Sequence, residues 1–145
     1  MPRPGIAIIA RLFVAAMVSS LAVAVTPSER AVESLKKVRD FSLAGDGFGG
    51  PVSPDERAFR AFMKQNPTAE DALSLISEGT PAAKIYAFVA LKKISPQQFA
   101  AMAPRFLSDP KKVRFQMGCM GGETTAGFLL RIISSDKFVL HLMPE

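Results

Sequence analysis

The chain has 145 residues, a formal net charge of +5, one cysteine and one histidine. This length predicts a single domain whose hydrophobic core is large enough to be stable without crosslinks. A lone cysteine excludes an internal disulfide, and one cysteine with one histidine cannot supply a zinc site. We therefore expect a protein that needs no metal and no other cofactor.

The first 24 residues have the pattern of a signal peptide. Arg3 and Arg11 precede a long apolar run, and Ala22-Val23-Ala24 gives the small-x-small pattern of a cleavage site. Cleavage would leave residues 25–145 as a single helical domain with a net charge of +3, since two arginines are removed. We expect an exported protein, periplasmic or secreted. The alternative is an uncleaved segment, residues 5–25, that anchors the protein in the inner membrane.

A helix and a glycine-rich connection are expected next. Thr26-Pro27 begins a helix that runs to about Arg39 and carries an apolar stripe at helical spacing. Residues 41–51 are rich in glycine and cannot form a helix, so they predict a long connection. A phosphate-binding loop is excluded here, because no Lys-Ser or Lys-Thr pair follows and the G-x-G-x-x-G order is absent.

Two amphipathic helices follow this connection. Ser53-Pro54-Asp55-Glu56 predicts a capping box that begins a helix ending near Gln65. Thr68 and Asp71 cap the next helix, which ends at Gly79. Each helix places its larger apolar side chains on one face, so both are expected to pack against a common core.

The most apolar helix is expected over Pro81–Ile94, after the N-cap Thr80. Its apolar residues fall on nearly every face, which indicates a helix buried at the centre of the domain. Its charges lie near its ends. Lys84 lies in the first turn, where the helix dipole does not favour a cation, and it is a weak candidate for a binding residue.

The periodicity changes after the central helix. Ser95-Pro96-Gln97-Gln98 predicts another capping box, and Pro104 should kink or split the helix that it begins. Lys112–Met117 alternates between apolar and polar residues, which is typical of a strand.

A turn, a helix and a second strand are expected at the end of the chain. Residues 118–122 predict a tight turn, Thr124 predicts the cap of a last helix, and Phe138–Leu142 predicts a short strand. Because one helix connects them, this strand and Lys112–Met117 should pair in parallel. The predicted fold is mainly α, a compact bundle of about five or six helices with a small two-stranded β element near the C-terminus.

The strongest candidate for chemistry is Cys119. It lies in a glycine-rich turn directly before the predicted last helix, whose free amides and dipole would lower the pKa of a thiol. Gly121 and Gly122 would let an anion approach the backbone, and His141 on the neighbouring strand could act as a base. The alternative interpretation makes Cys119 a small buried hydrophobe and His141 a strand residue that faces solvent.

Other functional classes lack support. The chain has no Gly-x-Ser-x-Gly nucleophile motif. The acidic pairs Asp55-Glu56 and Glu70-Asp71 lie in first helical turns, where the helix dipole explains them. The paired lysines are scattered over helix ends and turns and are not clustered with aromatic residues, so we expect no nucleic-acid partner.

Three segments together form a sequence signature. They are Gly49–Arg60, which contains Ser-Pro-x-Glu, Gly79–Ala87, which contains Thr-Pro-Ala-x-Lys-x-Tyr, and Gly118-Cys119. Over about residues 48–133 the chain resembles a group of small bacterial exported α-helical proteins, some of them catalogued with microcin gene clusters. The resemblance implies a stand-alone helical domain with HEAT-like packing that is not an enzyme of known type. It also implies an immunity or accessory role.

Two functional hypotheses follow. The first is an exported, non-catalytic module that binds another envelope protein as an inhibitor, immunity or accessory factor, and it predicts a sizeable exposed apolar patch or groove. The second is a small thiol-dependent enzyme or anion-binding protein centred on Cys119, which predicts a thiol in a pocket near His141 or Lys84. Contact with a membrane is expected only through an uncleaved N-terminal segment.

Overall fold

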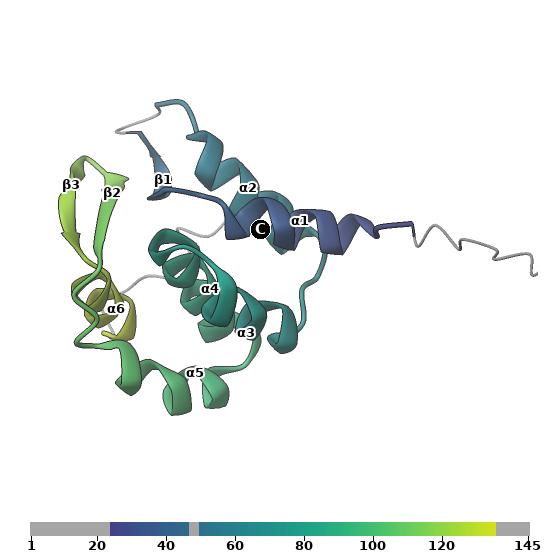
Figure 1. Cartoon of the computed structure of the whole chain (residues 1–145). Coiled ribbons are helices and arrows are strands. Elements are labelled where there is room, and N and C mark those ends of the chain that lie inside the picture. The colour runs from purple at the N-terminus through teal and green to yellow at the C-terminus, as the bar shows by residue number, and fades with distance from the viewer. Residues whose placement is uncertain (1–23, 47–49, 136–145) are drawn as a thin grey trace, which may run out of the picture.

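The computed structural model describes residues 24–46 and 50–135, which form six α-helices and a three-stranded sheet (Figure 1). The mainly α class is therefore confirmed. Residues 1–23 of the predicted signal peptide and the predicted strand at 138–142 lie outside the described residues. The elements in chain order are α1 (Pro27–Lys36), β1 (Asp40–Asp46), α2 (Pro54–Lys64), α3 (Ala69–Glu78), α4 (Pro81–Ile94), α5 (Pro96–Met102), the 3-10 helix η1 (Ala103–Phe106), β2 (Lys112–Gly118), β3 (Met120–Thr125) and α6 (Ala126–Ser134).

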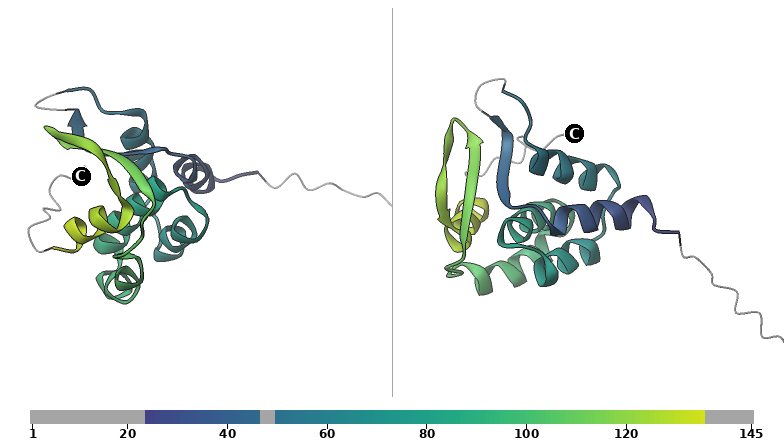
Figure 2. Two further views of the ribbon diagram at one scale, coloured as in Figure 1. Left: turned by 60° about the vertical axis from the view of Figure 1, so that its left-hand side comes forward. Right: turned by 45° about the horizontal axis from the view of Figure 1, so that its top comes forward.

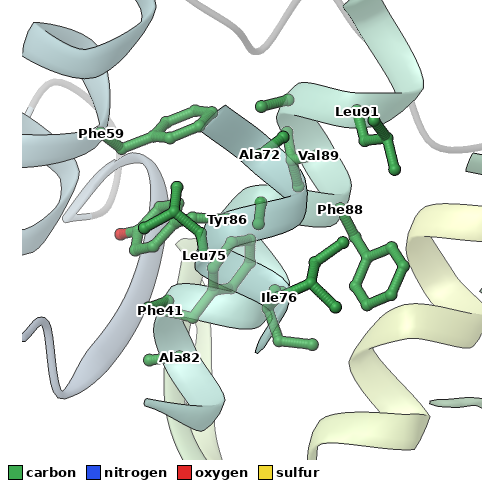
Figure 3. Close-up of a cluster of buried hydrophobic side chains, with 14 of the residues drawn as sticks. Phe41, Phe59, Ala72, Leu75, Ile76, Ala82, Tyr86, Phe88, Val89 and Leu91 are labelled. Carbon is green, nitrogen blue, oxygen red and sulfur yellow. The ribbon is translucent and has the colours of Figure 1, made fainter. Parts of the chain in front are cut away.

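The central helix α4 forms where the sequence predicts it. Thr80 caps it, because its hydroxyl oxygen accepts a hydrogen bond from the amide of Ala83 at 3.1 Å. Nine of its fourteen residues are buried, and α4 packs against α3, α5, α6 and the sheet. Figure 3 shows Tyr86 and Phe88 on opposite sides of this helix. The core is therefore built around α4 on all sides.

A mixed sheet lies beside the helices, with the strand order β1-β2-β3 (Figure 2). β1 and β2 pair in parallel, whereas β2 and β3 form an antiparallel hairpin. The sheet contacts α4 through β1 and β2, and it contacts α6 through β3. The sheet therefore joins the N-terminal and C-terminal parts of the domain across the central helix.

The prediction of a glycine-rich connection over residues 41–51 is wrong in its first half, which forms β1. Phe41 and Leu43 alternate with a polar residue, and both are fully buried against the helices. Glycine becomes important only near the end of the strand, where Gly45 has a φ of 74° and the pairing register shifts. The sequence prediction gave weight to the glycines and missed the alternating pattern of Phe41, Ser42 and Leu43 before them.

One predicted strand of the sheet is confirmed, but the strands that pair with it are not the one predicted. Lys112–Met117 is indeed a strand, but β1 and β3 occupy the two sides of β2. Both sides of Lys112–Met117 are therefore occupied, and the predicted strand at residues 138–142 lies outside the described residues. The described sheet has three strands, because residues 40–46 form β1 and the glycine-rich segment after β2 forms β3 and not only a turn.

Helix caps explain most of the helix boundaries. Thr26 and Thr68 each form a full capping box with the acidic residue three positions later. Ser53 forms half of one: its hydroxyl oxygen accepts the amide of Glu56 at 3.1 Å, but the Glu56 side chain is buried and bonds elsewhere. The predicted capping box at residues 53–56 is thus corrected to a single serine cap.

Two further predicted caps differ from the structure. Ser95 makes no side-chain cap bond, so the capping box predicted there does not form. The cap of α6 is Thr125, whose hydroxyl oxygen accepts the amide of Phe128 at 3.2 Å. The predicted cap Thr124 lies in β3 and pairs with Val113 of β2. Pro104 splits the preceding helix as predicted, since α5 continues as η1 around it.

Candidate functional site

Cys119 lies at the tip of the β2–β3 hairpin, and it is exposed. Met117 pairs with Met120, so Gly118 and Cys119 form a two-residue loop. Gly118 has a φ of 57° and Cys119 has no positive φ, which fits a type II′ turn with glycine at its first central position. Cys119 is therefore not a buried hydrophobe, and β3 separates it from the N-terminus of α6. Whether its thiol is reactive stays a prediction.

Gly121 and Gly122 are residues of β3 and do not form an anion-binding turn. Gly121 lies opposite Gln116, whose side-chain oxygen leaves no room for a Cβ at this position. Gly122, with a φ of 153°, lies opposite Phe115. The helix amides that were expected beside these glycines are instead capped by Thr125.

The remaining predicted candidates are not brought together with Cys119 by the described residues. His141 lies outside them, so its role as a base stays a prediction. Lys84 is half-buried in the first turn of α4 and lines none of the three clefts described below. Within residues 24–46 and 50–135, no group of three histidine, cysteine or acidic residues could hold a metal ion.

A cleft with a volume of about 740 Å³ lies between the start of α2 and the sheet, and we call it the sheet cleft. Its charged lining residues are balanced in sign, with three basic and three acidic side chains. It is lined by Lys37, Arg39, Asp40, Phe41, Ser42, Ser53, Pro54, Asp55, Arg114, Phe115, Gln116, Gly122 and Glu123.

Two carboxylates of the sheet cleft have structural roles. Asp55 Oδ2 accepts the backbone amides of Arg39 at 3.1 Å and Asp40 at 2.8 Å, which fixes the start of β1 against α2. Asp40 forms a two-bond ion pair with Arg114, at 3.0 and 2.9 Å, between β1 and β2. Because these groups already bind protein partners, the cleft does not present a free pair of carboxyl groups for acid–base chemistry.

A buried polar cluster lies beneath this cleft. The Tyr86 hydroxyl donates to the carbonyl oxygen of Ser42 and accepts from its amide, both at 2.7 Å. Glu56, fully buried, accepts the amide of Gly45 at 3.0 Å and the hydroxyl of Ser42 at 3.4 Å. Its other oxygen accepts two bonds from Arg60, at 3.1 and 2.6 Å. The cluster ties β1 to α2 and α4.

Sequence reasoning missed this cluster. Burial raises the pKa of the Tyr86 hydroxyl far above its usual range, and its hydrogen bond to the Ser42 backbone opposes that rise only in part. A signal was present, because Tyr86 lies in the most apolar helix, and a buried tyrosine hydroxyl usually has a hydrogen-bond partner. The role of Glu56 was hidden by its position in a capping motif.

A smaller groove, with a volume of about 380 Å³, lies where α2 and α4 end, and we call it the basic groove. Its charged lining residues are all basic, and its apolar ones include a buried proline. It is lined by Arg60, Met63, Lys64, Asn66, Pro67, Lys93 and Ile94.

A third cleft, with a volume of about 470 Å³, lies between α1 and α3 and is predominantly acidic. Its charged lining residues are Glu29, Glu33, Asp71 and Lys36. Lys36 bonds Glu33 at 2.7 Å, and this contact lowers the pKa of Glu33 and contributes to a raised pKa for Lys36. Glu29 and Asp71 belong to the caps of α1 and α3, so the charges of this cleft are explained by local structure.

The described surface does not carry the sizeable apolar patch that the binding hypothesis predicts. Its exposed large apolar side chains are Val25, Met120 and Phe128, which belong to three separate parts of the chain.

Comparisons with known protein families, curated proteins and solved structures found no match for this chain. The features that remain available to a partner are the outer edge of β3 and the basic groove.

Proposed function

We propose that this chain is an exported, non-catalytic helical protein that binds another envelope protein, and that its partner adds a strand to β3. The signal-peptide pattern of residues 1–24 supports export. The resemblance to a group of exported helical proteins, some of them catalogued with microcin gene clusters, supports an immunity, inhibitor or accessory role. The observation that carries the binding role is the exposed outer edge of the sheet.

The backbone of β3 offers unused hydrogen-bonding groups. In a hairpin with a two-residue loop, the flanking pair Met117 and Met120 exchanges its hydrogen bonds across the hairpin. The alternate residues Gly121 and Glu123 therefore direct their N–H and C=O groups away from β2. No described strand pairs with this side, and residues 120–123 are all exposed. An extended segment of another protein can hydrogen-bond here.

The composition of β3 favours such an approach. Exposed sheet edges usually carry lysine, proline or a covering element that prevents pairing. β3 has none of these along residues 120–124, and two of its residues are glycines without side chains. Figures 1 and 2 show no described helix beyond this edge. Glu123 is the single charge on the strand, and it already lies 4.0 Å from Lys112 Nζ of β2, so the proposed pairing relies on the backbone of β3.

Replacing the outward amide of Glu123 tests this proposal. The C-terminally tagged protein is crosslinked in the cell envelope and purified, and its partners are identified by mass spectrometry for the wild type, E123P and E123Q. Proline removes the amide that faces the partner but leaves the β2–β3 ladder intact. We expect one near-stoichiometric partner with the wild type and with E123Q, and a loss of at least about tenfold with E123P.

Absence of a partner from the wild type would contradict the binding role, and equal capture by E123P would contradict the β3 edge as its site. The intact mass of the same purified protein tests export. Cleavage after Ala24 removes the first 24 residues, whereas a retained segment supports the membrane-anchored alternative.

A further inference from the structure

The basic groove differs from the other two clefts in its charge. The sheet cleft has equal numbers of acidic and basic lining residues, and the cleft between α1 and α3 has three acidic residues and one basic residue. The basic groove has Arg60, Lys64 and Lys93 and no acidic residue. Its potential is therefore positive, and it would attract an anionic ligand.

Two of these three charges are available to a ligand. Arg60 is held by the buried Glu56 through two hydrogen bonds, so its charge is largely neutralised. Lys64 and Lys93 are both exposed, and neither takes part in an ion pair among the described residues. The neighbouring Lys92, in contrast, donates to the carbonyl oxygens of Ile133 and Ser135 and holds the end of α6.

The position of the two lysines is not explained by helix stability alone. Lys64 and Lys93 lie in the last turns of α2 and α4, where a basic residue complements the negative end of the helix dipole. That effect accounts for each lysine separately. The helix dipole does not explain why Lys64 and Lys93 line the same concave site. Met63 and Ile94 line it too, and their apolar side chains are only partly buried.

The shape and charge of the groove favour a polypeptide over a membrane surface. An apolar side chain fits a concave site of about 380 Å³. Recognition of an anionic membrane surface generally uses a cluster of four to eight basic residues. The two free lysines of this groove are few for that purpose, but they suit two carboxylates that flank one apolar side chain.

We propose that the basic groove binds an acidic segment of the partner protein, with one apolar side chain against Met63 and Ile94 and carboxylates against Lys64 and Lys93. This inference rests on the proposed binding function and names the chemistry of the partner. The segment that occupies the groove is separate from the strand that pairs with β3, so one complex would use both sites.

Selection of peptides tests the groove directly. A library of random twelve-residue peptides displayed on phage is selected on the purified protein, and the consensus peptide is then synthesised and its affinity is measured by fluorescence anisotropy. We expect enriched peptides to carry two or more acidic residues around one apolar residue. The double variant K64E/K93E should bind the consensus peptide at least about tenfold more weakly, and binding should weaken as salt is added.

The variant K111E is the matched control, because Lys111 is exposed and lies outside the groove. It should keep the affinity of the wild type, and thermal unfolding should show that all variants are folded. Selection without acidic enrichment, or equal affinity of K64E/K93E, overturns the proposal. Binding of phosphatidylcholine–phosphatidylglycerol vesicles that K64E/K93E abolishes would overturn the peptide occupant and assign the groove to an anionic lipid.

The envelope crosslinking experiment separates this inference from the proposed function. If K64E/K93E captures the same partner as the wild type in equal amount, the groove proposal fails and the binding function stands. If the wild type captures no partner, the binding function fails, whatever peptides the groove selects.

Discussion

At the residue scale, Tyr86 and Glu56 decide how β1 is held. Tyr86 satisfies both backbone groups of Ser42 inside the core, and Glu56 satisfies the amide of Gly45 at the end of the strand's regular pairing. Removing either side-chain group would leave buried backbone groups without hydrogen-bond partners, and this lowers the free energy of unfolding. The cluster is thus structural, and it explains two polar residues for which the sequence offered other interpretations.

We expect Y86F to destabilise the protein by about 2–4 kcal/mol, because two buried groups of Ser42 lose their hydrogen-bond partner while the ring packing is kept. Urea unfolding of both proteins gives this difference in the free energy of unfolding. The control is S42A, which removes only the 3.4 Å contact of the Ser42 hydroxyl with Glu56 and should cost about 1 kcal/mol or less. Equal losses in the two variants would contradict this account.

Glu56 and Glu70 offer a matched comparison, since both lie in the first turn of a helix. The dipole alone would give both similar, small effects of less than about 1 kcal/mol. The structure predicts that E56A costs about 2–4 kcal/mol, because Arg60 and the amide of Gly45 lose a buried partner. E70A should cost less than about 1 kcal/mol, as measured by the same unfolding experiment. Similar losses of stability in E56A and E70A would show that the buried cluster does not stabilise the fold.

At the scale of elements, the helices follow their own signals and two of the strands do not. The bounds of α4 match the prediction, and the predicted ends of α2 and α3 lie within one residue of those observed. Their capping residues and apolar periodicity act locally, so the sequence suffices. β3 has no comparable signal, because Met120-Gly121-Gly122 has low strand propensity and is a strand only through its pairing with β2.

The caps themselves can be compared by substitution. T68A should lose about 1 kcal/mol of stability, because the Thr68 hydroxyl oxygen accepts the amide of Asp71 at 3.2 Å. S95A should change stability by less than about 0.5 kcal/mol, because Ser95 makes no side-chain cap bond. Thermal unfolding followed by circular dichroism measures both. A larger loss in S95A than in T68A would contradict the observed caps.

At the scale of the whole molecule, the candidate surfaces depend on pairings between distant segments. The basic groove forms where the ends of α2 and α4 meet, about thirty residues apart in the chain, and no local motif marks it. The exposure of Cys119 follows from a hairpin that the sequence suggested only as a turn. Candidate residues could be found from the sequence, but their grouping could not, since grouping is a property of the tertiary structure.

The stability of the whole domain should fall at high pH because of Tyr86. Burial raises the pKa of its hydroxyl in the folded state, whereas the unfolded tyrosine ionises near its ordinary value of 10.0. Above that pH the unfolded chain releases a proton that the folded chain retains, so stability is complete below about pH 10 and decreases above it, by up to about 1.4 kcal/mol per pH unit. Urea unfolding between pH 8 and 11 should show this decrease relative to Y86F. Parallel pH profiles of the two proteins would contradict the prediction.

The parallel pairing of β1 with β2 also sets the order in which the domain can assemble. The Asp40–Arg114 pair joins residues 74 positions apart, whereas the β2–β3 hairpin closes over a two-residue loop. Closing the long loop has a much larger entropic cost, so the hairpin can form early but β1 can join it only after α2 to α5 have brought the two segments together. A growing chain therefore lacks its complete sheet until residue 125 has been synthesised, and β1 has no partner strand while residues 47–111 are being added.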